Sequence, residues 1–213
     1  ESRGLGDVYK RQGLWSLKTV NIRDYADDKH KTVDDTVFGG GSGMLMKPDI
    51  VANSLDKNIS KGEKIFYLSP KGKKFNQSFA NSLSKQNGIN LICGHFEGVD
   101  DRLLSTRNIE EISIGDYVLS GGETAAFVIL DAVLRLIPGV LGNKDSIKDE
   151  TFENSLLEYP QFTKPKIWEG KSVPEVLFSG DHAKIKSWRL SQSEAITRRQ
   201  RPDLWEKYLK DKK

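Results

Sequence analysis

The chain has 213 residues, of which 37% are hydrophobic and 30% are charged, and this balance excludes a disordered chain. A single cysteine excludes an internal disulfide framework and a cysteine-rich metal cluster, so we expect a reducing, cytoplasmic setting. The longest apolar stretch, residues 124–140, is interrupted by Asp131, Arg135 and Pro138. It is too short and too charged to span a bilayer, and we expect no membrane partner.

The charge is distributed unevenly along the chain. Residues 164–213 hold 13 Lys and Arg against 7 Asp and Glu, a net charge of +6, whereas the whole chain carries only +3. A basic C-terminal segment favours a polyanionic partner such as nucleic acid. A solvated helical face with a lysine tail is the alternative.

The first elements in chain order are short and weakly patterned. Residues 1–12 share no pattern with the rest of the chain, and we interpret them as a non-native leader left by a translated adapter; a natural flexible leader is the alternative. Residues 14–20 predict a short strand, and a glycine run lies at 39–43. Residues 48–60 predict a weak helix.

Strands and helices then alternate. Residues 64–69 predict a buried strand that Pro70 stops, residues 77–86 an amphipathic helix, and residues 89–93 a second strand. A third strand is expected within 111–119, before Gly121 and Gly122. This order predicts an α/β fold with a parallel sheet and helices on both faces.

Residues 124–137 predict a helix that is apolar nearly all round and therefore buried on most sides, which a second subunit would make easier. Residues 142–157 are polar and read as a linker or mobile loop. Asp181 is a candidate N-cap for a basic helix over 182–199.

Three of the predicted strands end in glycine or proline, at Ser69-Pro70, at Gly94 to Gly98 and at Gly115 to Gly122. Ligands of open parallel sheets bind beyond the carboxyl ends of the strands. Glycines there let the backbone approach a ligand, and Leu68, Ile114 and Leu119 would offer apolar walls to an adenine. Neither a Walker loop nor a Rossmann fingerprint is present.

Seven segments resemble, in order, the blocks of the tRNA (guanine-N1)-methyltransferases, the TrmD type of the SPOUT superfamily. They are FGGGSGMLM (38–46), FYLSPKGKKF (66–75), CGHFEGVDDR (93–102), SIGDYVLSGGE (113–123), IPGVLGN (137–143), LLEYPQFTKP (156–165) and SGDHAKIKSWR (179–189). Relatives open with an apolar strand and a helix where this chain has residues 1–12.

The resemblance implies a deep trefoil knot, which no periodicity would indicate, and an obligate homodimer with the active site at the subunit interface. It implies a knotted catalytic domain over 13–141, a catalytic loop over 142–157 and a basic helical tRNA-binding domain over 158–213. It also implies methyl transfer from S-adenosylmethionine to N1 of guanine 37 of tRNA, next to the anticodon. Magnesium dependence is suggested by the resemblance alone, and the sequence offers no metal-ligand cluster.

The donor contacts that the resemblance implies lie at the three strand ends. They are Tyr67, Leu68, Ser69, Pro70, Gly94, Glu97, Ile114, Gly115, Asp116, Tyr117, Val118, Leu119, Gly121 and Gly122.

For catalysis, guanine N1 must lose its proton to become a nucleophile, so a general base is expected. By resemblance that base is Glu150, with adjacent Asp149 as the alternative, and Arg135 would stabilise charge on guanine O6. Without the resemblance, Glu150 would read as a solvated loop carboxylate and Arg135 as an ion-pair partner of Asp131.

The target base is expected at the glycine loop, and the tRNA phosphates at the basic helix. The implied substrate contacts are Asp34, Asp35, Gly39, Gly40, Gly41, Gly43, Arg189, Arg198 and Arg199. Two alternatives remain open: another SPOUT methyltransferase acting on rRNA or another tRNA site, and a non-catalytic RNA-binding protein with the same fold.

Overall fold

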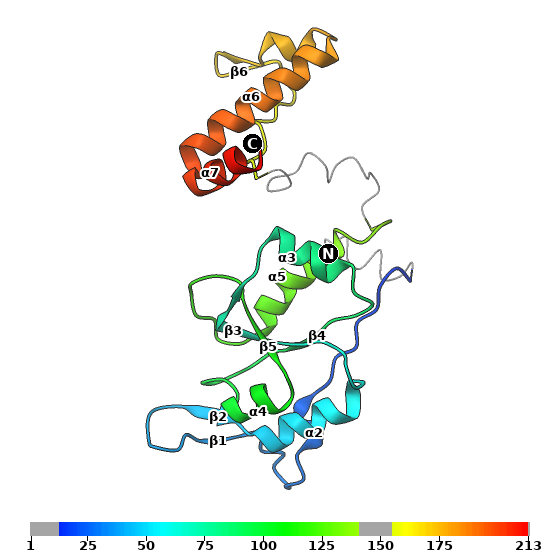
Figure 1. Cartoon of the computed structure of the whole chain (residues 1–213), viewed down its shortest axis with the longest axis vertical. Helices are drawn as coiled ribbons and strands as arrows, with labels where there is room; N and C mark the ends of the chain where they lie inside the picture. The colour runs from blue at the N-terminus through cyan, green and yellow to red at the C-terminus, as the bar shows by residue number, and fades with distance from the viewer. Residues whose placement is uncertain (1–12, 141–154, 213) are drawn as a thin grey trace. The chain divides into compact units, whose positions relative to one another are not determined.

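The computed structural model describes residues 13–140 and 155–212 (Figure 1). The chain divides into two compact units, residues 1–142 and 143–213.

The first unit is built on a parallel sheet of the order β4-β3-β5. The central strand β3 (Ile65–Lys74) pairs in parallel with β4 (Asn90–Ile92) and with β5 (Glu110–Ser113). The predicted α/β fold with a parallel sheet is therefore confirmed.

Helices cover both faces of this sheet (Figure 1). Side chains alternate along β3, so Ile65 and Tyr67 pack toward α2 (Pro48–Asn58) and α4 (Asp101–Thr106). Phe66 and Leu68 pack toward α3 (Gln77–Ser84) and α5 (Glu123–Leu134) on the other face. Two apolar clusters result, one on each side of β3.

Three strand predictions differ from the structure. Residues 14–20 form no strand, and Leu14 and Leu17 are exposed. The strand β3 runs past Pro70 to Lys74, because residues 73–74 pair again with β5 after a register shift. The strand β5 ends at Ser113, where the Ser113 hydroxyl oxygen accepts a hydrogen bond from Gly115 N at 3.2 Å and turns the chain.

The remaining elements of the first unit are short. The 3-10 helix η1 (Ile22–Tyr25) lies against α2, and β1 (Asp34–Thr36) pairs antiparallel with β2 (Met44–Met46) around the glycine run. These elements and α4 lack the length that a periodic pattern needs, so the sequence did not indicate them.

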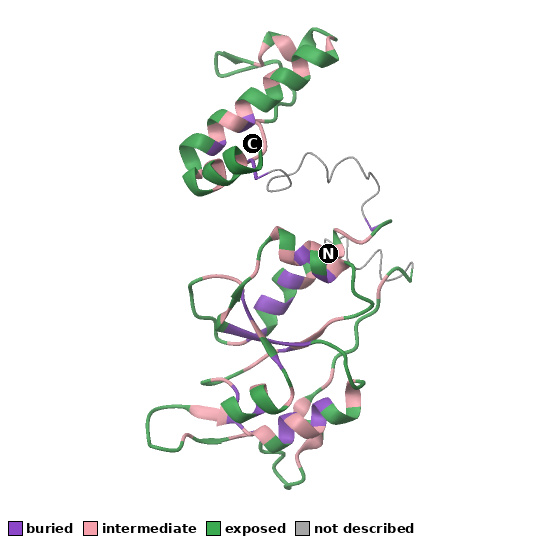
Figure 2. Ribbon diagram, viewed as in Figure 1, coloured by how far each residue is buried: buried purple, intermediate pink, exposed green. Residues whose placement is uncertain are grey.

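Helix α5 is buried on one face only. Ala125, Ile129 and Val133 lie in the core, but Phe127 is 69% and Val128 46% exposed (Figure 2). The prediction that this helix is buried on most sides is wrong for the single chain, because the sheet covers only one side of it. An apolar helix face is left open.

The second unit is mainly helical. Asp181 caps α6 (His182–Gln200) by accepting hydrogen bonds from the backbone N–H groups of residues 183 and 184, as predicted. Helix α7 (Pro202–Asp211) packs on α6, and its Tyr208 donates a 2.6 Å hydrogen bond to Glu194. That bond, against the effect of burial and with help from Lys212, lowers the pKa of Glu194.

The start of the second unit lies earlier than the predicted boundary at residue 158. Leu157 N donates to the buried hydroxyl oxygen of Thr197 at 2.8 Å, and that hydroxyl donates to Ser193 O at 2.7 Å. Ser155 and Leu156 are buried as well. Residues 155–157 therefore belong to the packed unit and not to a linker.

Between this segment and α6 lie a hairpin of β6 (Ile167–Trp168) and β7 (Lys171–Ser172), and the 3-10 helix η3 (Glu175–Phe178). Within residues 13–140 and 155–212, no helix is both long and apolar enough to cross a membrane.

Candidate active site

The carboxyl end of β4 meets the start of α5 at a close backbone contact. Gly122 N donates a 2.9 Å hydrogen bond to Gly94 O. A β-carbon on Gly122 would lie 2.7 Å from Cys93 Cα and 2.9 Å from Gly94 N, both backbone atoms. Only glycine fits at this junction, which brings two of the three glycine-rich strand ends together.

We expect Gly122→Ala to destabilise the protein by about 1–3 kcal/mol, because the added methyl group forces backbone to move. Gly88→Ala is the matched control, since nothing lies within 4 Å of its β-carbon position and its φ is not in the left-handed region. Urea unfolding of both variants checks this. Equal free energies of unfolding of the two variants would show that the backbone at the junction accommodates the methyl group without loss of stability.

Tyr67 links the end of β3 to the same junction. Its side chain lies so close to Gly94 and Gly98 that β-carbons there would approach its ring or hydroxyl to 2.7 Å. Burial raises the pKa of Tyr67, and the nearby Glu111 carboxylate raises it further, against a hydrogen bond with the Val99 backbone. The hydroxyl therefore stays neutral at physiological pH.

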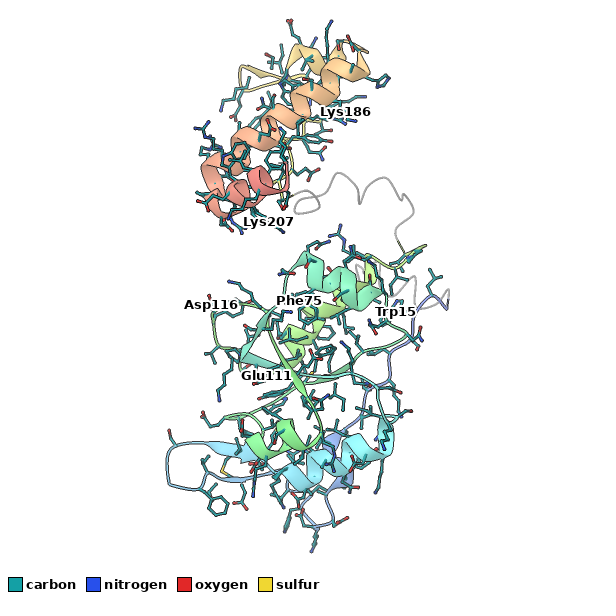
Figure 3. All side chains as sticks on the ribbon, viewed as in Figure 1. Trp15, Phe75, Glu111, Asp116, Lys186 and Lys207 are labelled. Atoms are coloured by element: carbon teal, nitrogen blue, oxygen red, sulfur yellow. The ribbon has the colours of Figure 1, made fainter. Side chains whose placement is uncertain are left out.

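The carboxyl end of β5 is the third strand end, and it packs against the second half of β3 and the residue that follows it. A β-carbon on Gly72 would lie 2.4 Å from the backbone of Glu111 and Ile112, and Phe75 N donates to Ser113 O at 2.7 Å. Phe75, Glu111 and Asp116, labelled in Figure 3, mark this segment, β5 and the loop after it. The three glycine-broken strand ends thus lie close together at the carboxyl edge of the parallel sheet.

A polar pair spans two of these loops. His95 Nε2 lies 2.6 Å from Glu123 Oε1, joining the loop after β4 to the first turn of α5. Burial acts to raise the pKa of Glu123, but the hydrogen bond with His95, a hydrogen bond from the Glu123 backbone and the electrostatic interaction with His95 together lower it. The sequence did not indicate this pair, although Glu123, as the last residue of the 113–123 block, was an available signal.

Cys93, beside this pair, is not a nucleophile at neutral pH. Burial, and then the Glu123 carboxylate, raise the pKa of its thiol to about 11. Cys93 is half-buried and packs against the apolar cluster around Phe66 and Leu68.

The glycine loop abuts the loop after β4. Glu97 N donates to Met44 O and Met46 N to Gly98 O, both at 2.9 Å, so β2 runs beside residues 97–99. A β-carbon on Gly43 would meet the Glu97 side chain at 2.5 Å. Gly39, Gly40, Gly41 and Gly43 all adopt left-handed φ values, and Asp34 and Asp35 lie in β1.

The other expected donor residues divide by exposure. Leu68 and Ser69 are buried, Pro70 is exposed, and Ile114 and Gly115 are half-buried. Residues 116–119 form an exposed loop in which Val118 is 85% and Tyr117 53% exposed. This loop presents apolar side chains that the core of the chain does not cover.

The expected catalytic residues are only partly described. Arg135 is the C-cap of α5 and is exposed, with its N–H bonded to Asp131 O at 3.3 Å. Glu150 and Asp149 lie outside the described residues.

The expected tRNA contacts of the second unit all lie on α6. Arg189 stacks on the Tyr159 ring at 4.8 Å, and Arg198 and Arg199 are exposed at the C-terminal end of the helix. Across the part of the chain that the structure describes, no group of three or more His, Cys, Asp or Glu side chains could hold a metal ion. Magnesium thus has no support from the described residues.

Comparison with known proteins gives one family. Residues 4–207 match the model of the family described as tRNA (Guanine-1)-methyltransferase TrmD. A tRNA (guanine-N(1)-)-methyltransferase of Pelagibacter ubique is 75% identical over 210 residues, covering 99% of this chain and 92% of that protein. Those of Brucella canis and Bartonella henselae are each 53% identical over 202 residues, covering 95% of this chain and 82% and 87% of theirs.

The family match begins within residues 1–12, the segment that the sequence pattern sets apart as a leader. The match also includes all three strand ends, the glycine loop and most of the second unit. The chain belongs to the tRNA (guanine-N1)-methyltransferase family.

Proposed function

We propose that this protein transfers a methyl group from S-adenosylmethionine to N1 of guanine 37 of tRNA, next to the anticodon. The observation that carries the proposal is the convergence of three glycine-broken strand ends at the start of α5, with the glycine loop packed beside them. The reaction is inferred from membership of the family, and the binding site is inferred from this arrangement of strand ends and glycine loop.

The strand ends fit the donor. Gly94 in the loop after β4, and Gly115 and Gly121 in the loop after β5, are half-buried and carry no side chain that would keep a ligand from the backbone, which suits the hydrogen-bonding edge of an adenine. The apolar side chains of Tyr117, Val118 and Leu119 are exposed beside them. Bound S-adenosylmethionine would supply an electrophilic methyl group on its sulfonium.

The reaction needs two further groups from the chain. Glu150 would accept the N1 proton, so that the N1–methyl bond forms as the methyl–sulfur bond breaks and S-adenosylhomocysteine leaves. Arg135 would stabilise negative charge that develops on O6. Asp34, Asp35 and the glycines at 39–43 would receive the target base, and Arg189, Arg198 and Arg199 would bind tRNA phosphates.

We also infer that the trefoil knot of the family is present. The family match over all of residues 13–140 supports it. A cytoplasmic location follows from a tRNA substrate and from the use of a single cysteine.

A homodimer is inferred from the open face of α5. A dimer interface through Phe127 and Val128 would cover the apolar face that the sheet leaves exposed. We expect Phe127→Asp to yield monomers and to lose at least about 100-fold in methyl transfer, because the desolvated carboxylate opposes association. Sedimentation of the variant checks this, with Leu209→Asp, 43% exposed on α7, as the control.

If Phe127→Asp sediments like the parent protein, α5 is not the interface. If both variants become monomers, the effect belongs to added charge and not to the helix face.

Methylation of matched tRNA transcripts tests the proposed function. We expect transfer to a transcript with G at position 37 and none to the same transcript with A. Transfer to both would place the target elsewhere, and transfer to rRNA alone would support the other SPOUT activity. Binding of tRNA without any transfer would support a non-catalytic RNA-binding protein.

A further inference from the structure

The hairpin of β6 and β7 in the second unit presents an aromatic and basic surface to solvent. Its two-residue turn, Glu169-Gly170, has φ values of +49° and +75°, as a tight hairpin of this length requires. Val173 N donates to Lys166 O at 3.0 Å and extends the pairing by one position. The hairpin is therefore a short but defined element and not a loose loop.

Its two faces differ in chemistry. Because side chains alternate along a strand, Lys166 and Trp168 share one face, and Lys171 joins them as the cross-strand partner of Trp168. Ile167 and its partner Ser172 lie on the opposite face. We call Lys166, Trp168 and Lys171 the hairpin face.

The hairpin face is open to solvent (Figure 2). Trp168 is 63% exposed, and residues 161–172 are exposed throughout. Lys166 Nζ lies 4.5 Å from the centre of the Phe178 ring, itself 54% exposed, which places a second aromatic ring beside the face. Trp168 and Phe178 together place two exposed aromatic rings around Lys166, and an exposed patch of this kind indicates a partner.

The composition identifies the kind of partner. Lysine is depleted at the cores of protein–protein interfaces, yet Lys164, Lys166 and Lys171 surround this tryptophan, with Glu169 as the one acidic residue between 164 and 171. An aromatic platform flanked by cations is the arrangement that binds single-stranded nucleic acid, where bases stack and phosphates pair with ammonium groups.

We propose that the hairpin face binds an unpaired nucleotide of the tRNA substrate. The Trp168 indole stacks on the base, and Lys166 and Lys171 contact the flanking phosphates. This site is separate from the arginines of α6, and it rests on the proposed function in so far as that function makes tRNA the natural ligand.

Binding of a tRNA transcript to the full chain tests the proposal. We expect Trp168→Ala to weaken the Kd by about fivefold or more, the loss of one stacked base, while Trp168→Phe retains most of the affinity. Ile167→Ala is the matched control, because Ile167 is 62% exposed on the other face of the same hairpin. Equal tRNA affinity of Trp168→Ala and Ile167→Ala would overturn the proposal.

Two further measurements identify the contacts. We expect the Lys166→Ala/Lys171→Ala double variant to lower the salt slope of binding by about 1.4, the value for two single-strand phosphates. We expect Trp168→Ala to weaken the Kd for an oligouridine of roughly 12 nucleotides, but not the Kd for an RNA duplex of the same length. An equal loss of affinity for the oligouridine and for the duplex would contradict a site for an unpaired nucleotide, and so would an unchanged salt slope.

A protein partner for Trp168 would show itself without RNA. If Trp168→Ala lowers the melting temperature or the donor affinity of the free protein relative to Ile167→Ala, the indole packs on protein and the proposal fails. Methyl transfer by the parent chain is scored separately. If the parent chain shows no methyl transfer but Trp168→Ala still binds tRNA more weakly than Ile167→Ala does, the proposed function is rejected and the RNA site is retained.

Discussion

Replacing Arg135 with alanine is expected to lower kcat for methyl transfer to tRNA by about 100- to 1,000-fold, the usual cost of removing one donor to a developing oxyanion. As N1 loses its proton, negative charge spreads to O6, and a guanidinium there acts on the transition state more than on bound substrate. Arg135 is the exposed C-cap of α5, at the end of the helix opposite to the strand ends, so this role requires that Arg135 act in the site of the other subunit of the proposed homodimer.

The expected loss is confined to the chemical step. We expect donor affinity, measured by calorimetry, to stay within about twofold of the parent value, because the expected donor contacts lie at the strand ends and not at this end of α5. Arg102→Ala is the control, since Arg102 is an exposed arginine of the same unit that pairs with Asp100 at 2.7 Å. Turnover unchanged in Arg135→Ala would remove this residue from the mechanism.

The burial of the central strand β3 on both of its faces could be predicted from the sequence. The run from Ile65 to Leu68 is apolar at every position, which is typical of a strand covered on both faces, and the structure divides these residues between two clusters. Asp181 could also be predicted as the N-cap of α6, because a capping side chain binds backbone N–H groups only two or three residues away.

The contacts that assemble the site could not be read in the same way. Gly122 is restricted by the backbone of Cys93, 29 positions earlier in the numbering, and Gly72 by the backbone of β5. Periodicity reports neighbours along one element and carries no information on which strand ends touch. The pairing of His95 with Glu123 is a contact of the same long-range kind.

Helix α5 shows how a correct pattern leads to a wrong expectation. Its apolar residues extend around the helix and predict burial on most sides, which a second subunit would make easier. The structure covers only the face of Ala125, Ile129 and Val133 and leaves Phe127 in solvent. The sequence pattern shows how much apolar surface the helix has, but not whether the side chains that pack against this surface belong to the same chain.

The identity of the base rests on two adjacent carboxylates, Glu150 and Asp149, which lie outside the described residues. We expect Glu150→Gln to lower kcat by about 100- to 10,000-fold, the range for loss of a general base, and Asp149→Asn to stay near the parent rate. The two amides are nearly isosteric with the acids they replace, so each variant removes the basic oxygen and little else.

The pH dependence separates loss of a base from loss of structure. Without a carboxylate to take the N1 proton, deprotonation falls to hydroxide, so the rate of Glu150→Gln should rise about tenfold per pH unit between roughly pH 6 and 8. The parent enzyme, in which a carboxylate accepts the N1 proton, should depend on pH less steeply. A large loss in Asp149→Asn with a near-normal Glu150→Gln would assign the proton to Asp149, because only the residue that accepts it can convert the reaction to one driven by solvent hydroxide.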